Sequence, residues 1–189
     1  MKKFVTVLLF SILALDLTAS PVVVQAKPQT PTVTEALVGA AMETKDDYLL
    51  PYPGILPDHP LYFLKALRDR ILEGLIVDPL RKAEFYILQA DKRLNMGLFF
   101  NTQGKSTQME EVISKGEKYM EKAVSGLVAL KTTGVQIPAS IIDRIEKSLV
   151  KHTQILEGLI VQGNESQKAG LTQSLELIQR LQGELGKLK

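Results

Sequence analysis

Apolar side chains recur at three- and four-residue steps along most of the chain after residue 60, and this spacing constrains the fold more than any other feature. Such steps place successive side chains on one face of an α-helix. No segment alternates between apolar and polar residues with the period of two that a half-buried strand requires. The sequence therefore predicts an all-α protein, a mostly antiparallel bundle of four or five helices joined by short loops.

Breaks in this pattern divide the bundle domain, which we place at residues 50–189, into separate helices. Asp78-Pro79 is the clearest start signal, because an acid can cap a helix whose first residue is proline. Glycines near residues 104, 134 and 163 end the helices that precede them. The predicted helices are Leu61 to near Val77, Pro79 to near Thr102, Ser106 to Thr132, Pro138 or Ala139 to near Gly163, and Glu165 to Leu188.

Residues 1–26 are typical of a secretory signal peptide. Lys2 and Lys3 form a basic end, residues 4–17 form an apolar core, and Val24-Gln25-Ala26 precedes the expected cleavage site. An uncleaved membrane anchor is the alternative, although the core is shorter than the roughly 20 residues of a span and contains Asp16. Residues 27–49 are predicted to be a flexible linker that could include a short helix. We therefore expect export to the periplasm or the extracellular space.

The composition excludes several functional classes. The chain contains no cysteine, which excludes disulfides, thiolate metal sites and cysteine nucleophiles. Its formal net charge is +2, and this falls to +1 once Lys2, Lys3 and Asp16 leave with the signal peptide. A nearly neutral chain does not fit a dedicated nucleic-acid binder, which needs clustered Lys and Arg to contact phosphates. No cofactor is expected.

A proline-rich strap leads into the first helix. Its prolines at positions 51, 53, 57 and 60 fix φ and remove donors, which predicts an extended backbone from residue 50 to Pro57. Pro60 is expected in the first turn of the helix, with Asp58 or His59 as the cap. Within this helix Leu and Ile residues are predicted to form one face, and the charged residues mostly the other. The charged residues are Lys65, Arg68, Asp69 and Arg70.

Two segments carry a resemblance to a known family. LPDHPLYFLKALRDRI, followed by DPLRKAEFYILQADKRL, resembles the extracytoplasmic domain-of-unknown-function family 5667 over roughly residues 50 to 130. The matching positions are Leu56, Pro57, Asp58, Pro60, Leu61, Tyr62, Leu64, Lys65, Asp78, Lys82, Ala83, Glu84, Ala90, Arg93 and Leu94. His59 departs from the pattern, because serine is more usual there. The resemblance implies an exported helical protein and no assigned activity.

Two histidines are the best general bases and metal ligands that the chain offers. His152 lies on the apolar stripe of its helix, where a buried histidine paired with a neighbouring helix is the simpler interpretation. His59 follows Asp58, and the pair could bind a metal, although helix capping explains both residues. The two histidines lack the spacing of a metal motif, so we predict no metal site and keep His59 and His152 as the only candidate ligands.

Carboxylates held close together could act as an acid and a base. Glu84 and Asp91 are seven residues apart and are predicted to project from the same side of the second helix. Acids mixed with lysines more often form solvated faces or ion pairs between helices, so no catalytic residue is predicted. Glu84 and Arg93 belong to the segment that resembles the family, and we name them as candidates for a buried polar contact.

Basic residues near the first helix suggest a membrane surface as another partner. They are Lys65, Arg68, Arg70, Arg81 and Lys82. Interspersed acids dilute this cluster, so the sequence predicts neither stable lipid binding by the cluster alone nor membrane insertion after signal cleavage. The interspersed acids are Asp69, Glu73 and Asp78.

The sequence as a whole predicts an exported, non-catalytic helical bundle that binds or scaffolds an envelope protein or polymer. The alternative is an extracytoplasmic sensor or chaperone-like protein that responds to metal or stress, with His59, His152 and nearby acids as ligands. The regular stripes of the last two helices also permit pairing between chains, so a homo-oligomer is an alternative to packing within one chain.

Overall fold

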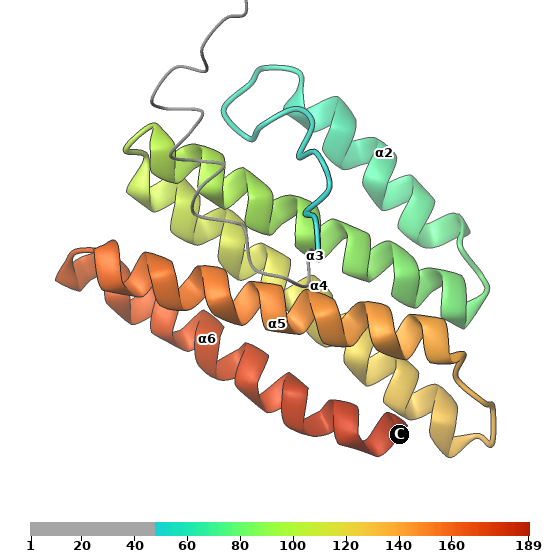
Figure 1. Ribbon diagram of the computed structural model, residues 1–189. Coiled ribbons are helices and arrows are strands. Elements are labelled where there is room, and N and C mark those ends of the chain that lie inside the picture. Colours follow the sequence, from blue (N-terminus) through green and yellow to red (C-terminus); the bar gives the residue numbers. More distant parts are fainter. Residues whose placement is uncertain (1–47) are drawn as a thin grey trace, which may run out of the picture. The chain divides into compact units, whose positions relative to one another are not determined.

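The computed structural model describes residues 48–189, and the predicted signal peptide and most of the predicted linker lie outside this range. The described part contains five α-helices, a short 3-10 helix and no strand, which confirms the predicted all-α class. Helices α3 to α6 run side by side as a bundle, and α2 lies outside it next to α3 (Figure 1). The elements are α2 (Tyr62–Leu75), α3 (Pro79–Thr102), α4 (Ser106–Thr132), α5 (Ala139–Gln162), α6 (Glu165–Leu185) and η1 (Gly186–Leu188).

The bounds of the bundle helices follow the sequence pattern because local chemistry fixes them. Pro79 is the first residue of α3, and Oδ1 of Asp78 accepts a hydrogen bond from the Arg81 N–H at 2.9 Å. Gly104 and Gly134, which follow α3 and α4, have φ of +69° and +86°, a conformation that glycine adopts without strain. A capping box between Asn164 and Gln167 begins α6.

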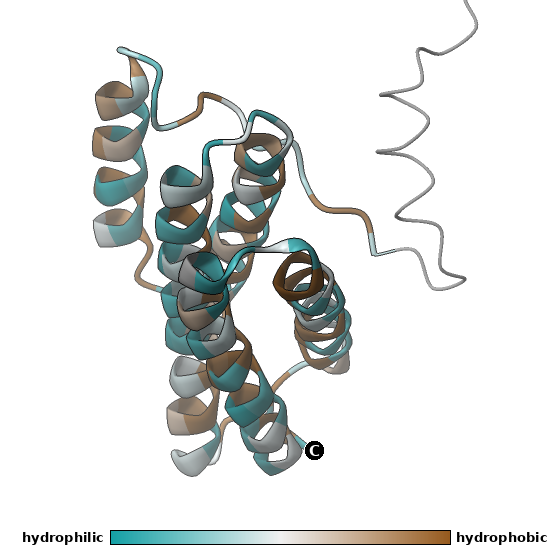
Figure 2. Cartoon of the chain, turned by 90° about the vertical axis from the view of Figure 1, so that its left-hand side faces the viewer, coloured by the Kyte–Doolittle hydropathy of each residue, from teal (hydrophilic) through white to brown (hydrophobic). Residues whose placement is uncertain are grey.

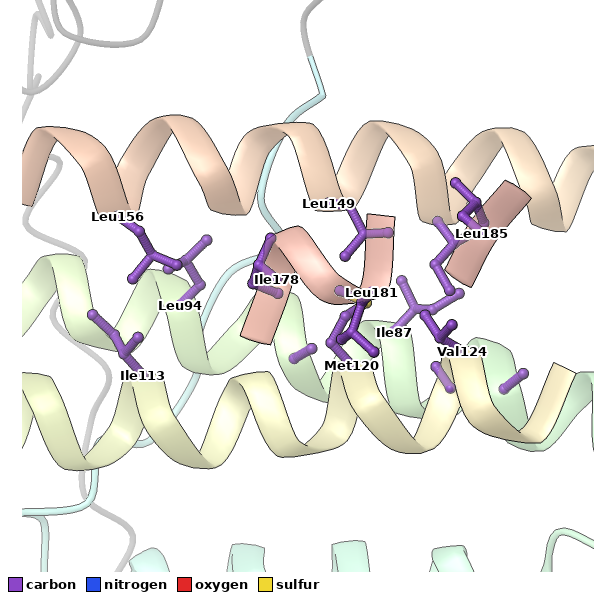
Figure 3. Close-up of a cluster of buried hydrophobic side chains, with 14 of the residues drawn as sticks. Ile87, Leu94, Ile113, Met120, Val124, Leu149, Leu156, Ile178, Leu181 and Leu185 are labelled. Atoms are coloured by element: carbon purple, nitrogen blue, oxygen red, sulfur yellow. The ribbon is translucent and has the colours of Figure 1, made fainter. Parts of the chain in front are cut away.

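The hydrophobic core lies between α3, α4, α5 and α6. Figure 3 shows side chains from all four helices converging on one another. Each fully buried side chain of this kind contributes about 1.5–3 kcal/mol to the stability of the fold. The labelled members are Ile87, Leu94, Ile113, Met120, Val124, Leu149, Leu156, Ile178, Leu181 and Leu185, all of them buried. The apolar stripes of α5 and α6 are therefore buried within a single chain.

Helices α3 and α4 approach each other closely at two glycines. A Cβ atom placed on Gly97 would lie 2.6 Å from Cδ1 of Ile113, and one placed on Gly116 would lie 3.2 Å from the Ala90 carbonyl oxygen. Both distances are shorter than an ordinary van der Waals contact. Glycine at these positions therefore allows the two helices to pack closely.

The start of α2 differs from the prediction. Helix α2 begins at Tyr62 after Leu61, with no side-chain cap, and Pro60 lies in the turn before it. That turn is closed by the Tyr62 N–H, which donates to the His59 carbonyl at 2.9 Å, and the turn before it by the His59 N–H, which donates to the Leu56 carbonyl at 3.0 Å. Asp58 instead forms an ion pair with Lys105, with Nζ 2.5 Å from Oδ2. Asp58 does not cap the helix as predicted, because its carboxylate pairs with Lys105. Nδ1 of His59 accepts a hydrogen bond from the Leu61 N–H at 3.1 Å, so His59 stabilises the turn directly before α2 and not an N–H of α2 itself.

The spacing of α2 predicts two faces but not which of them meets the bundle, and in the structure it is the charged face that does so. Its charged residues Lys65 and Asp69 are buried, whereas its large apolar side chains are exposed. Five of them, Phe63, Leu64, Leu67, Ile71 and Leu75, are between 50% and 70% exposed, and we call them the α2 outer face. Figure 2 shows brown, hydrophobic stretches on this outlying helix.

Polar contacts explain why α2 turns this way. The apolar stripes of α3 and α4 already face α5 and α6, so α2 meets the polar outer surface of α3 and α4. There Oε1 of Glu73 accepts hydrogen bonds from the Tyr86 hydroxyl and the Lys122 ammonium, each at 2.9 Å. Charged side chains of α2 can form hydrogen bonds and ion pairs with the polar groups of this surface, whereas leucine side chains could not.

Gly97→Ala is expected to destabilise the fold by about 1–3 kcal/mol, because the new methyl group overlaps the fully buried Ile113 side chain. Gly126→Ala is the matched control, since a Cβ atom there meets nothing within 4 Å. It is expected to raise the stability by roughly 0.5–1 kcal/mol through helix propensity. Urea unfolding of both variants checks this, and equal stability changes would contradict the close approach.

Glu73→Gln is expected to speed hydrogen exchange of the α2 amides about two- to fivefold, because the charged contacts that hold α2 to the bundle weaken. The exchange of α3 to α6 should not change. Glu111→Gln is the control, since Glu111 pairs with Lys115 on its own helix. Uniform acceleration over all helices would show instead that α2 is part of the core unit.

Candidate functional site

Polar side chains from four segments meet inside the bundle. Asp91 comes from α3, Glu117 from α4, Ser148 and His152 from α5, and Tyr48 from the segment before α2. We call these five residues the His152 cluster. The side chains of Asp91 and His152 have no exposed area, and that of Glu117 is 1% exposed.

The His152 ring joins the two carboxylates of the cluster. Its Nδ1 lies 2.9 Å and 3.0 Å from the two oxygens of Glu117, and its Nε2 lies 3.2 Å from Oδ1 of Asp91. The same Oδ1 accepts a hydrogen bond from the Ser148 hydroxyl at 2.5 Å, and Oδ2 accepts one from the Tyr48 hydroxyl at 2.6 Å. Both oxygens of Asp91 are therefore satisfied, as buried carboxylates must be.

Electrostatics favour a charged ring in this cluster. Burial by itself lowers the pKa of His152, but the negative charge of Glu117 and the hydrogen bonds that the ring donates to Asp91 and Glu117 outweigh it and raise the pKa to about 9. At neutral pH the ring is then an imidazolium that donates one N–H to each carboxylate. Burial, together with the charge and hydrogen bond of Asp91, raises the pKa of Tyr48 to about 12, so its hydroxyl stays protonated and donates.

The chemistry available to this cluster is limited by its closure. A general base must be unprotonated near the working pH and must reach a substrate proton. His152 is protonated and fully buried, and both of its nitrogens are engaged on opposite sides of the ring. In the part of the chain that the structure describes, no group of three or more His, Asp or Glu side chains is arranged to hold a metal ion. The geometry is that of a structural ion network.

The histidine prediction from sequence is confirmed for His152, which is buried and paired with a neighbouring helix. His59 is exposed, and its Nδ1 accepts a hydrogen bond from the Leu61 N–H at 3.1 Å. The two histidines therefore occupy different environments, one at the surface and one in the core.

The two candidate residues on α3, Arg93 and Glu84, also differ in burial. Arg93 is buried, and its Nη1 donates to the carbonyl oxygen and to Oε1 of Gln89, at 3.0 Å and 2.6 Å. Its guanidinium carbon lies 4.2 Å from the centre of the Tyr119 ring, a cation–π contact. Glu84 is exposed, although Asp91, seven residues later, is fully buried. The expected buried polar contact therefore exists at Arg93 and not at Glu84.

The sequence did not reveal Glu117 and Asp91 as partners of His152, or Ser148 and Tyr48 as donors to Asp91. Glu117 carried a usable signal, because it lies four residues after Ile113 and three before Met120, on a stripe of core residues. Asp91 lies in the same way between Ile87 and Leu94. An acid on the core-facing stripe of a helix needs a buried cation, and the chain offers His152 on a similar stripe.

The second candidate site is the α2 outer face. Monomeric proteins rarely expose a contiguous apolar patch of this kind unless it binds something. The remaining α2 candidates lie on the opposite side of the helix, where Nζ of Lys65 is 5.3 Å from the centre of the Tyr62 ring. Asp78 and Pro79 form the cap of α3 and have a structural role. The α2 outer face is therefore the candidate binding surface of this helix.

Comparisons with family models, with curated proteins and with solved structures found no match to this chain. The resemblance to family 5667 therefore stays a prediction. Within residues 48–189, no helix combines the length and the apolar character that a membrane span requires.

The stability of the fold is expected to fall as the pH rises through about 9. The folded-state pKa of His152, about 9, lies above its ordinary value of 6.5, so the contribution of the imidazolium is fully present below pH 6.5 and is lost as His152 deprotonates. The loss is on the order of 3 kcal/mol. Urea unfolding from about pH 6 to about pH 10 measures it.

Glu117→Gln provides the check on this assignment. It removes the charge that does most to raise the pKa of His152, so the His152 ring signal in proton NMR should titrate at a lower pH than in the parent chain. His59 supplies the only other histidine signal. An unchanged His152 titration would show that Glu117 does not hold the ring charge.

Proposed function

We propose that this chain is an exported, non-catalytic helical bundle that binds a component of the cell envelope through the α2 outer face. The observation that carries the proposal is the exposure of the five large apolar residues of that face, on a helix whose other side contacts the bundle through Glu73. The N-terminal signal and the resemblance to an extracytoplasmic family support the expected location. Both of these observations come from the sequence alone.

The bundle does not need α2 to complete its core. Residues of α3 to α6 and η1 make up the fully buried apolar cluster, and no residue of α2 belongs to it. Helix α2 contributes no core residue, and its large apolar side chains stay in contact with water, which is unfavourable. Stability of the fold therefore does not explain why these side chains are apolar. Binding of a partner to these side chains gives them a function.

The non-catalytic part of the proposal rests on the His152 cluster. It contains the one buried histidine of the chain, and its polar atoms are occupied by one another. The same occupation disfavours the metal-responsive alternative, because His152 would have to leave both carboxylates to bind an ion. The chaperone-like alternative keeps its support, since an exposed apolar face can also hold unfolded chains.

A photo-reactive benzophenone side chain at position 67 is expected to crosslink an envelope component in living cells, because Leu67 is 54% exposed at the middle of the α2 outer face. The control is the same side chain at Val161 on α5, which is 83% exposed and lies outside that face. Adducts are detected by gel shift and mass spectrometry. Equal adducts from both positions, or none from position 67, would contradict the proposal.

A further inference from the structure

We propose that the partner of the α2 outer face is an anionic lipid bilayer surface, on which α2 lies flat. This inference rests on the proposed function and names the ligand class of the same face. Its support comes from where the structure places the charges of α2.

The acids of α2 face the bundle and are neutralised there. Oδ2 of Asp69 lies 3.4 Å from Nζ of Lys65, and its Oδ1 lies 2.7 Å from Nη2 of Arg68. Glu73, the second acid of α2, pairs with Lys122 of α4 at 2.9 Å. Lys65 and Arg68 offset Asp69, and Lys122 offsets Glu73, so neither acid offers a free charge to the outside. Arg70 is left as the unpaired charge of α2.

Arginines border the exposed apolar residues. The Arg68 side chain is 61% exposed and pairs with Asp69, whereas Arg70 is exposed and pairs with no acid of α2. At 100° per residue, Arg68 and Arg70 fall on the two sides of the stripe formed by Leu64, Leu67 and Ile71. An apolar stripe bordered by arginines is the pattern of a helix that lies in the plane of an anionic membrane interface.

The α2 outer face also carries an aromatic side chain. Phe63, a member of this face, is 62% exposed. Such rings are favoured at the boundary between lipid headgroups and acyl chains. With 14 residues, α2 is too short to cross a bilayer but long enough to lie along one.

A second copy of the chain fits this face less well. A two-fold interface would set the α2 outer face against itself, so that Arg70 of each copy would enter the interface. Asp69 already pairs with Arg68, and Glu73 with Lys122, so no acid of α2 is left to pair with Arg70. Anionic lipid headgroups supply the missing negative charge.

The test uses a local fluorescent reporter in the full-length chain. Because the chain has no cysteine, Leu67→Cys carries a polarity-sensitive nitrobenzoxadiazole label at one position only. Vesicles of phosphatidylcholine with phosphatidylglycerol should shift its emission to the blue, and a spin-labelled lipid should quench it. Vesicles of phosphatidylcholine alone should give at most a small change, and added salt should reverse the shift. A local reporter separates α2 from any membrane contact of the N-terminal residues.

Matched variants sharpen the test. The same label at Val161→Cys on α5 should not respond. In the labelled chain, Arg70→Gln should weaken binding about fivefold, as expected for one arginine near an anionic surface, whereas Lys118→Gln on exposed α4 surface should not. Leu64→Ser with Ile71→Ser should weaken it at least about tenfold. Leu64 and Ile71 are both exposed residues of the α2 outer face, so the double variant should keep the fold.

Three results would overturn the inference. The label at position 67 could be unresponsive to both kinds of vesicle, respond equally to both, or already be shielded from water without any vesicle. The last result would mean that another part of the chain or a second copy covers the face. If the label fails while the benzophenone at position 67 crosslinks a protein or polymer in cells, the proposed function stands and the lipid is the wrong ligand.

Discussion

The packing of α3, α4 and α5 depends on the buried imidazolium of His152, which lies between the carboxylates of Asp91 and Glu117. Either acid left alone in the core would cost several kcal/mol, so the three helices are stable together only in the arrangement that brings these side chains into contact. Hydrogen bonds from Ser148 and Tyr48 complete the satisfaction of Asp91 and attach the segment before α2 to the bundle. The apolar stripes on either side then supply most of the stabilising free energy, and the ion network selects the register in which they meet.

Sequence alone predicted much of this architecture. Helices α3 and α4 begin and end where the spacing and caps predicted, because Asp78-Pro79, Gly104 and Gly134 act on their own neighbours. Pairing across helices was harder to foresee, since the partners of His152 are 35 and 61 residues away in the chain. In the sequence, only the position of His152 on an apolar stripe indicated that this residue is buried. Glu84 and Asp91 share a helix side by spacing, yet one is exposed and one buried.

Helix α2 shows where the periodicity argument fails. Amphipathic spacing indicates that a helix has two faces, but it does not say which face meets the rest of the protein. In this chain Glu73, Lys65 and Asp69 face the polar outer surface of the bundle, and the leucines face water. The pattern that normally marks a core helix here marks a surface available for binding. The proposed binding role follows from this orientation, and the proposed absence of catalysis from a buried polar cluster whose groups are occupied with one another.

The most direct test of this account is the protonation of the His152 ring, measured by nitrogen-15 NMR of the histidine side chains near neutral pH. If the ring is an imidazolium between Asp91 and Glu117, both ring nitrogens will give the shifts of protonated nitrogen, and their protons will exchange slowly with water because the cluster is closed. A ring with one unprotonated nitrogen, or with protons that exchange rapidly, would contradict the account. It would leave His152 available as a base or as a ligand.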